Sequence, residues 1–264
     1  MGMKYCSLSS GSSGNCQYIE TDSMKILVDG GLSGKRIEYL LSSIDVSIQD
    51  IDCILVTHEH IDHVKGVGVI SRRYDIPILA NEKTWLAMSK LIGNIDHKNI
   101  KIIETDKAFQ LKDLGIYPFR IFHDAADPVG YCFYHKNIKM SIMTDTGWVN
   151  EQMKSIIKDS NLYVIESNHD LKMLKEGRYP WHLKKRILSN RGHLSNLDAG
   201  KVLSEVLRGN GETVLLAHLS KENNIPSLAY ETVHRYMEEC GLNVNKDIQL
   251  DLTYRDRATR VYAL

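Results

Sequence analysis

The sequence predicts a mixed α/β protein, and three observations support this class. Short runs with the alternation typical of strands fill the chain up to residue 28. Beyond them, segments with strand and helix patterns alternate, and no linker or low-complexity segment separates the two halves. The 264 residues are 43% apolar and 25% charged, which suits one large globular domain. We therefore expect residues 1–264 to form a single domain made of two βα halves.

The elements of the first half are predicted from the spacing of apolar residues. Strands are expected where apolar residues alternate or run continuously between turn residues. These segments are residues 4–8, 16–20, 24–28, 51–56, 76–80, 101–103, 117–123 and 131–134. Helices are expected where apolar residues recur at helical spacing, and Asn81 supplies a cap for the third of them. They cover residues 35–44, 64–74 and 81–90.

The second half repeats this alternation. The expected strands are residues 138–144, 162–166 and 213–217, and the expected helices are residues 150–158, 196–207 and 227–240. Periodicity alone supports only a mixed α/β class. Two sheets packed face to face, with helices on both outer surfaces, would bury all of these apolar runs.

The run Thr57-His58-Glu59-His60-Ile61-Asp62-His63 directly follows the apolar stretch 51–56 and indicates a metal site. Polar groups of this kind are seldom gathered without a partner that uses them. Because alternate residues of an extended segment share a face, His58 and His60 point to one side. Asp62 and His63 belong to the turn that follows and can point at a second position, so two metals are plausible. The alternative is a polar surface turn with incidental histidines.

Cysteine content and hydropathy exclude two classes of protein. The five cysteines form no C-x-x-C pair, so neither a disulfide framework nor a cysteine zinc site is indicated. No apolar run has the length needed to cross a bilayer, and the N-terminus is rich in serine and glycine where a secretory signal is apolar. We expect a cytoplasmic protein that has no membrane partner.

The charge balance argues against a protein that coats nucleic acid generally. Lys and Arg total 33 and Asp and Glu total 33, whereas such proteins are usually basic. Two clusters are candidates for local patches that meet phosphate: Lys184-Lys185-Arg186 with Arg191, and the C-terminal Arg255, Arg257 and Arg260. Ordinary solvated faces are the alternative for each cluster.

The His58 to His63 run has every letter of H-x-H-x-D-H, and with three later motifs it resembles the metallo-β-lactamase superfamily. These motifs are Phe122-His123-Asp124-Ala125, Met143-Thr144-Asp145-Thr146-Gly147 and Leu216-Ala217-His218-Leu219-Ser220, in the order the superfamily uses. The resemblance covers nearly the whole chain and implies a four-layer αββα sandwich. Segments 8–16, 166–170 and 192–196 look like the bacterial YycJ/WalJ group, which is associated with DNA exonuclease activity.

The resemblance implies a ligand set for two divalent metal ions. His58, His60 and His123 would hold one ion, Asp62, His63 and His218 would hold the other, and Asp145 would bridge both. Mixed nitrogen and oxygen donors suit zinc, manganese or iron without choosing among them. A hydroxide held between the metals would attack phosphorus or a carbonyl carbon, so hydrolysis is the expected reaction.

Several further residues are expected to support this chemistry. Asp29 resembles an aspartate that orients a ligand, although an ordinary turn residue is the alternative. Asp62, Glu166 and His193 are the expected catalytic residues, because Glu166 and His193 resemble a pair that delivers a proton to the leaving oxygen. His169 is a candidate for contact with substrate phosphate or a metal, or else a surface histidine. Ser12, Ser13 and Asn15 lie in a small flexible loop that can approach a phosphate, unless it is a plain hairpin connection.

The leading hypothesis is a metal-dependent phosphodiesterase acting on nucleic acid, namely a double-stranded DNA 5′-to-3′ exonuclease. The alternative is a small-molecule ester, thioester or lactone hydrolase that uses the same two-metal core. A third hypothesis is a binding module with an inactive hydrolase core, against which the complete ligand set argues. No long insertion lies between Asp145 and His218, so we expect duplex DNA ends or short exposed strands as substrate. The oligomeric state is not indicated by the sequence.

Overall fold

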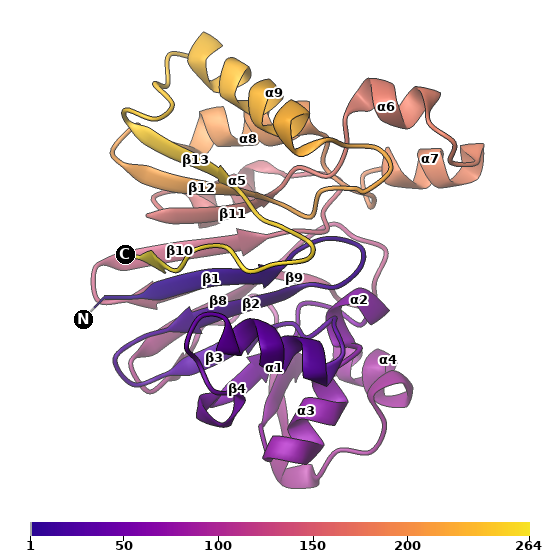
Figure 1. Cartoon of the computed structure of the whole chain (residues 1–264), viewed down its shortest axis with the longest axis vertical. Helices are drawn as coiled ribbons and strands as arrows, with labels where there is room; N and C mark the ends of the chain where they lie inside the picture. Colours follow the sequence, from indigo (N-terminus) through magenta and orange to yellow (C-terminus); the bar gives the residue numbers. More distant parts are fainter. Residues whose placement is uncertain (1) are drawn as a thin grey trace.

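The computed structural model describes residues 2–264 and contains two seven-stranded sheets (Figure 1). The first sheet is built from the N-terminal half and takes its edge strand β14 from the C-terminus. Its strands, in spatial order, are β14 (Tyr262–Ala263), β1 (Lys4–Ser9), β2 (Cys16–Glu20), β3 (Lys25–Val28), β4 (Cys53–Leu55), β5 (Ile78–Asn81) and β6 (Ile100–Ile103). Strands β3 to β6 run parallel, so their carboxyl ends share one edge.

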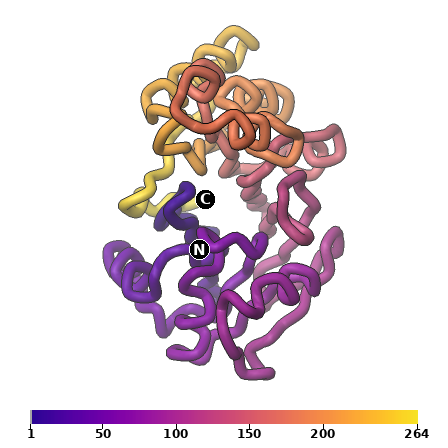
Figure 2. Tube along the Cα trace, turned by 90° about the vertical axis from the view of Figure 1, so that its right-hand side faces the viewer, coloured from indigo at the N-terminus to yellow at the C-terminus, as the bar shows by residue number. Residues whose placement is uncertain are grey.

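The second sheet is built from the chain between residues 109 and 252. Its strands, in spatial order, are β13 (Ile248–Leu252), β12 (Glu212–Ala217), β11 (Leu162–Glu166), β10 (Ile138–Met143), β9 (Val129–His135), β8 (Leu114–Arg120) and β7 (Phe109–Leu111). Strands β10 to β13 are parallel. Because Lys4 pairs with Ala263, the two ends of the chain lie side by side, as Figures 1 and 2 show.

Helices cover the outer face of each sheet. The helices are α1 (Gly34–Ser42), α2 (Ile61–Val64), α3 (Val67–Tyr74), α4 (Glu82–Ile92), α5 (Glu151–Ile157), α6 (Leu171–Glu176), α7 (Trp181–Ile187), α8 (Asn196–Val206) and α9 (Pro226–Glu239), with 3₁₀ turns at Ile48–Asp50 and His97–Asn99. None of the helices within residues 2–264 combines the length and apolar character needed to span a membrane.

Three apolar clusters account for the layers. One lies between the two sheets, a second joins the first sheet to α1, α3 and α4, and a third joins the second sheet to α5, α8 and α9. Since each sheet is apolar on both faces, it must be covered on both. The α/β class and the four-layer αββα sandwich expected from the resemblance are confirmed.

The main differences from the sequence-based predictions are a broken helix and several short elements. The predicted helix 64–74 is interrupted before Val67, since Gly66 donates its N–H to the Gly30 carbonyl at 2.7 Å. A Cβ on Gly66 would lie 2.3 Å from the Leu32 carbonyl oxygen, so the chain passes there only without a side chain. The predicted strand 117–123 ends at Arg120. The sequence patterns do not predict five of the elements, because these elements are short or have little periodicity. They are β7, α6, α7, β13 and β14.

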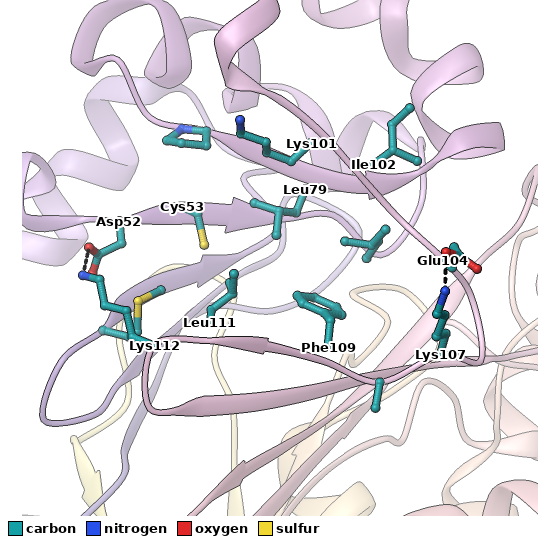
Figure 3. Close-up of a pocket in the computed structure, with 14 residues that line it drawn as sticks. Asp52, Cys53, Leu79, Lys101, Ile102, Glu104, Lys107, Phe109, Leu111 and Lys112 are labelled. Carbon is teal, nitrogen blue, oxygen red and sulfur yellow. Dashed lines mark hydrogen bonds and ion pairs between the residues drawn. The ribbon is translucent and has the colours of Figure 1, made fainter.

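A cavity of about 610 Å³ opens where the edge strands β6 and β7 of the two sheets meet (Figure 3). Its wall is apolar, with Leu79, Phe109 and Leu111 prominent, and its rim carries ion pairs such as Asp52 with Lys112 at 2.7 Å. Among its described lining residues, none is a predicted metal ligand. The predicted metal ligands gather instead at the carboxyl ends of strands of both sheets.

Candidate metal centre

The predicted ligands come together in two groups. Donor atoms of His58, His60 and His123 all lie within 4.8 Å of one another. Donor atoms of Asp62, His63 and His218 do the same. The sequence-based division of six ligands between two positions therefore corresponds to two adjacent sets of side chains.

The first four ligands are positioned by the end of β4 and the start of α2. After β4, an extended segment places His58 Nε2 3.1 Å from His60 Nδ1. His60 is also the residue that precedes α2, and the first turn of this helix carries Asp62 and His63. The change from extended chain to helix sends these two side chains in a different direction. Four donors close in sequence thus serve two positions.

The remaining ligands follow strands of the second sheet. His123 Nε2 lies 3.2 Å from His60 Nδ1, across the interface between the halves. Asp145 comes two residues after β10, and His218 comes directly after β12. Both have left-handed backbone conformations, with φ of 57° and 56°, which are uncommon for residues other than glycine. This backbone turn directs the two side chains from the strand ends toward the first sheet.

Asp145 contacts His63 and His218 of the second group and lies near His58 of the first. Its Oδ2 is 3.4 Å from His63 Nε2, and its Oδ1 is 3.4 Å from His218 Nδ1. Its donor atoms lie within 4.8 Å of those of His58 and His63, and also of those of Glu166, His193 and His218. The bridging role of this carboxylate stays a prediction.

The residues present fit divalent metal ions. Asp145 Oδ2 and His218 Nε2 are buried, and neither has a hydrogen-bond partner within the described chain. An unpartnered buried polar atom is costly, and coordination to a cation would satisfy both atoms. Imidazole nitrogens with carboxylate oxygens are ordinary ligands of divalent transition metals.

Asp29 fixes the ring of His63. Its carboxylate accepts hydrogen bonds from the Thr57 N–H at 2.8 Å and from the Thr57 hydroxyl at 2.9 Å. The same carboxylate lies 2.7 Å from His63 Nδ1, which leaves Nε2 facing the cluster. This is the contact that the predicted orienting role of Asp29 needs. Thr57 is a supporting residue that the sequence did not suggest, although it directly precedes the H-x-H-x-D-H motif.

Glu166 links a predicted ligand to His193. Its Oε1 lies 2.7 Å from His193 Nδ1 and 2.8 Å from His218 Nδ1. Its Oε2 accepts the backbone N–H groups of Thr146 and Leu194. The carboxylate is fully buried, whereas the His193 side chain is 19% exposed. His193 is therefore held rigidly through Nδ1, and Nε2 is the ring nitrogen available to a substrate.

The N-terminal loop packs against the metal cluster. Asn15 is buried, its Oδ1 accepts the Gly11 N–H at 2.8 Å, and its Nδ2 lies 2.9 Å from His63 Nε2. This placement favours a positioning role for Asn15 over the substrate contact expected from the sequence. Ser12 and Ser13 are exposed at the tip of the loop, and their contact with substrate stays a prediction.

Two further supporting residues lie inside motifs quoted from the sequence but received no role there. The Ser10 hydroxyl accepts the His218 N–H at 2.9 Å. Asn168 Nδ2 donates to the His218 carbonyl oxygen at 2.8 Å. Both contacts stabilise the left-handed backbone at His218. They could not be predicted from the sequence, because Ser10 and Asn168 are far from His218 along the chain.

His169 does not face the solvent. The residue is 1% exposed, and neither ring nitrogen has a hydrogen-bond partner among the described residues. Burial lowers the pKa of its imidazole to about 4, so the ring is neutral near pH 7. A side chain this deeply buried cannot touch a polymer without rearrangement, contrary to the substrate contact expected from the sequence.

The carboxylates control the charge of the cluster. Burial disfavours protonation of His218, but Asp145, Asp62 and Glu166 outweigh it and raise the pKa of His218 to about 10. Burial also raises the pKa of Glu166, yet His193 and His218 outweigh it and bring that pKa to about 2. Burial and the neighbouring His63 hold the pKa of His58 well below its usual range. Asp29 and Asp145 likewise outweigh burial at His63 and raise its pKa well above the usual range, so before metal binds the cluster carries positive charge on His63 and His218.

Metal binding is expected to release protons near neutral pH. His218 is protonated below its pKa of about 10, and its Nε2 must be unprotonated to bind a metal. Affinity for zinc should therefore rise with pH up to that value. Calorimetry in buffers of different ionisation enthalpy measures the protons released, and a His218→Asn variant should release fewer. Equal proton release by the two proteins would contradict this charge assignment.

Comparisons with known proteins agree with this geometry. Residues 10–193 match the model of the family described as the metallo-beta-lactamase superfamily. The chain is 46% identical over 263 residues to the protein named exodeoxyribonuclease YycJ of Bacillus anthracis, covering 99% of both chains. It is 44% identical over 261 residues to exodeoxyribonuclease WalJ of Streptococcus pneumoniae, covering 98% of this chain and 97% of the relative.

A solved structure shows the same fold at much lower sequence identity. The metallo-beta-lactamase fold protein YhfI of Bacillus subtilis superimposes with a TM-score of 0.75 at 14% identity, and the match covers 99% of each chain. The ligand motifs, the four-layer architecture and the family match agree. The chain therefore belongs to the metallo-β-lactamase superfamily, in the group that contains YycJ and WalJ.

Proposed function

We propose that this chain is a metal-dependent phosphodiesterase that degrades double-stranded DNA from the 5′ end. The observation that carries the proposal is His193, held by Glu166 beside the ligand cluster, because a hydrolase of phosphodiesters needs a proton donor for the leaving oxygen. The two relatives at 46% and 44% identity are named exodeoxyribonucleases, and they match this chain over nearly its full length.

The proposed metal content is two ions of zinc, manganese or iron. His58, His60 and His123 would hold one ion, Asp62, His63 and His218 would hold the other, and Asp145 would contact both. When bound, such a pair supplies a water activated at neutral pH and Lewis-acid stabilisation of the phosphoryl oxygens. Asp29 fixes the His63 ring through Nδ1, and Glu166 does the same for His218. Both contacts keep the ligand nitrogens pointed into the cluster.

His193 is proposed to complete the reaction as the general acid. Glu166 accepts a hydrogen bond from Nδ1 and fixes the ring, so that an Nε2–H can be directed at the leaving oxygen. The same carboxylate holds His218, so the position of His193 is tied to that of a proposed metal ligand. Among the proposed ligands, His60 and Asp62 are the more exposed, at 30% and 21% of their side chains, and a phosphate can approach from their side.

The direct test compares 5′-labelled and 3′-labelled duplex DNA incubated with the purified protein and manganese or zinc. A 5′-to-3′ exonuclease releases the 5′ label at once as a short product, while a 3′-labelled strand shortens progressively. Single-stranded RNA of equal length serves as the competing substrate. Preference for RNA would overturn the DNA assignment. No cleavage of either polymer, combined with hydrolysis of a small ester, would favour the small-molecule hydrolase.

A further inference from the structure

One surface outside the metal cluster has a charge unlike that of the rest of the chain. The α6–α7 segment, residues 171–191, contains seven Lys or Arg residues and one acidic residue, while the whole chain has 33 of each sign. Six of the seven cations are exposed: Lys172, Lys175, Arg178, Lys185, Arg186 and Arg191. The seventh, Lys184, is buried and donates to the Lys175 carbonyl at 2.7 Å, which ties α7 to the end of α6. The segment is therefore a strongly basic surface in a protein whose formal net charge is zero.

The same surface exposes aromatic rings. Trp181, the first residue of α7, is 63% exposed, and Lys185 Nζ lies 5.5 Å from its ring centroid. Trp148 is 47% exposed and packs against Phe122, the residue before His123, with ring centroids 5.0 Å apart. Cations together with exposed rings match both parts of a nucleic-acid strand, its phosphates and its bases.

The α6–α7 segment contacts the surroundings of the metal cluster through one ion pair and one backbone hydrogen bond. Arg186 pairs with Asp124, whose other carboxylate oxygen lies 3.3 Å from His123 Nε2. At its end, the Ile187 carbonyl accepts the His193 N–H at 3.0 Å. In Figure 1, α6 and α7 stand on the same side of the molecule as α2, which carries Asp62 and His63. A strand whose phosphate reaches His193 therefore passes beside this segment.

The loop after Asp145 closes against the end of the segment. A Cβ on Gly147 would lie 2.3 Å from the Ser189 carbonyl oxygen and 2.4 Å from the Gly192 nitrogen. Trp148 therefore sits next to the last residues of the segment, and Trp181 sits at the start of α7. Along the chain, the exposed cations Lys185, Arg186 and Arg191 lie between Trp181 and this contact.

We infer that the α6–α7 segment holds the DNA strand next to the scissile phosphate, with phosphates on its exposed cations and a base stacked on Trp181. The inference rests on the proposed function and adds the surface that binds the substrate polymer. Its physical basis is charge complementarity to phosphate, which makes affinity depend on salt, and stacking, which does not. The two contributions are separable by experiment.

The test measures binding of a fluorescent duplex with a single-stranded overhang by anisotropy at several KCl concentrations. All proteins in this binding experiment carry Asp145→Asn, so that the DNA is not cleaved during the measurement. The combined variant Arg178→Gln, Lys185→Gln and Arg191→Gln should reduce the slope of log K against log salt by about 0.9 for each phosphate that the protein no longer neutralises. Trp181→Leu should weaken binding about tenfold with an unchanged slope, and Trp181→Phe should restore most of the affinity.

The matched control is Lys158→Gln with Lys246→Gln. These exposed lysines precede β11 and β13, at the edge of the second sheet opposite the metal cluster. A combined α6–α7 variant with the same slope and affinity as this control would overturn the inference. In the background that retains Asp145, hydrolysis of bis(p-nitrophenyl) phosphate should be equal for all surface variants, since that small diester needs no strand-binding surface. If the unmutated protein fails to cleave DNA, the proposed function fails, while the salt slopes still decide the role of the segment.

Discussion

Replacing Asp145 by asparagine is expected to lower the rate of DNA degradation by about a thousandfold, because two-metal stabilisation of the transition state is worth several kcal/mol. The buried carboxylate lies between His63 Nε2 and His218 Nδ1, 3.4 Å from each. Asparagine keeps the shape of the side chain but removes the charge that the two proposed metal positions would share. Metal content per chain, measured by mass spectrometry, should fall together with activity.

The control for this substitution is Asp251→Asn. It removes a carboxylate of the same sheet that accepts a hydrogen bond from the Tyr262 hydroxyl at 2.8 Å, outside the ligand cluster. This variant should keep both the metal content and the rate. An Asp145→Asn protein with full metal content and an unchanged rate would contradict the bridging position proposed for Asp145.

Replacing His193 by alanine is expected to slow DNA cleavage by about a thousandfold, the middle of the range for general acid catalysis. Hydrolysis of bis(p-nitrophenyl) phosphate should fall far less, since its leaving group departs as a stable anion without a proton. Metal content should stay the same, because His193 is not among the proposed ligands. Parallel rate measurements on the two substrates, with metal analysis, check this result.

The comparison of substrates separates proton delivery from a structural role. A His193→Ala protein that loses both reactions equally would place the residue in support of the metal cluster, and unchanged DNA cleavage would exclude it from catalysis. The matched control is His97→Ala, which changes an exposed histidine in the 3₁₀ turn before β6. This variant should change neither rate. Glu166→Gln should reproduce part of the His193→Ala effect, since Glu166 holds the ring at 2.7 Å.

Both predictions also separate the proposed function from its rivals. A small-ester hydrolase would depend on Asp145 but would need no proton donor matched to a phosphodiester. A binding module with an inactive core would depend on neither residue for any reaction. The described structure keeps every predicted ligand in one cluster, which gives the enzymatic hypotheses their physical basis.

Most of the strands could be predicted from sequence because their signal is local. The strands Cys16–Glu20 and Leu162–Glu166 have the bounds that apolar patterning predicts, and Asn81 caps α4 by accepting the Thr84 N–H. Four of the proposed ligands could be predicted for the same reason, since His58, His60, Asp62 and His63 lie within one strand-to-helix junction. Their chemistry depends on spacing along a short stretch of chain, which the sequence shows directly.

Other features could not be predicted locally. The break before α3 depends on Gly66 meeting the Gly30 carbonyl, a contact between segments far apart in the chain. Helices α6 and α7 are six and seven residues long, which is too short for apolar periodicity to predict them. The sequence therefore did not indicate that the cations of residues 171–191 belong to one structural segment. The burial of His169 and of Asn15 also follows from packing that no local pattern records.

By itself, the sequence determined the α/β class, the resemblance to a family and the types of residue in the metal cluster, because apolar period and motif spacing are properties of neighbouring residues. The tertiary structure alone decided which donors meet: strand ends from two sheets bring Asp145 between His63 and His218, and Glu166 between His193 and His218. It also decided that the cations of residues 171–191 stand beside that cluster. Distances between residues remote in sequence are set by sheet pairing and packing, and these are properties of the whole chain.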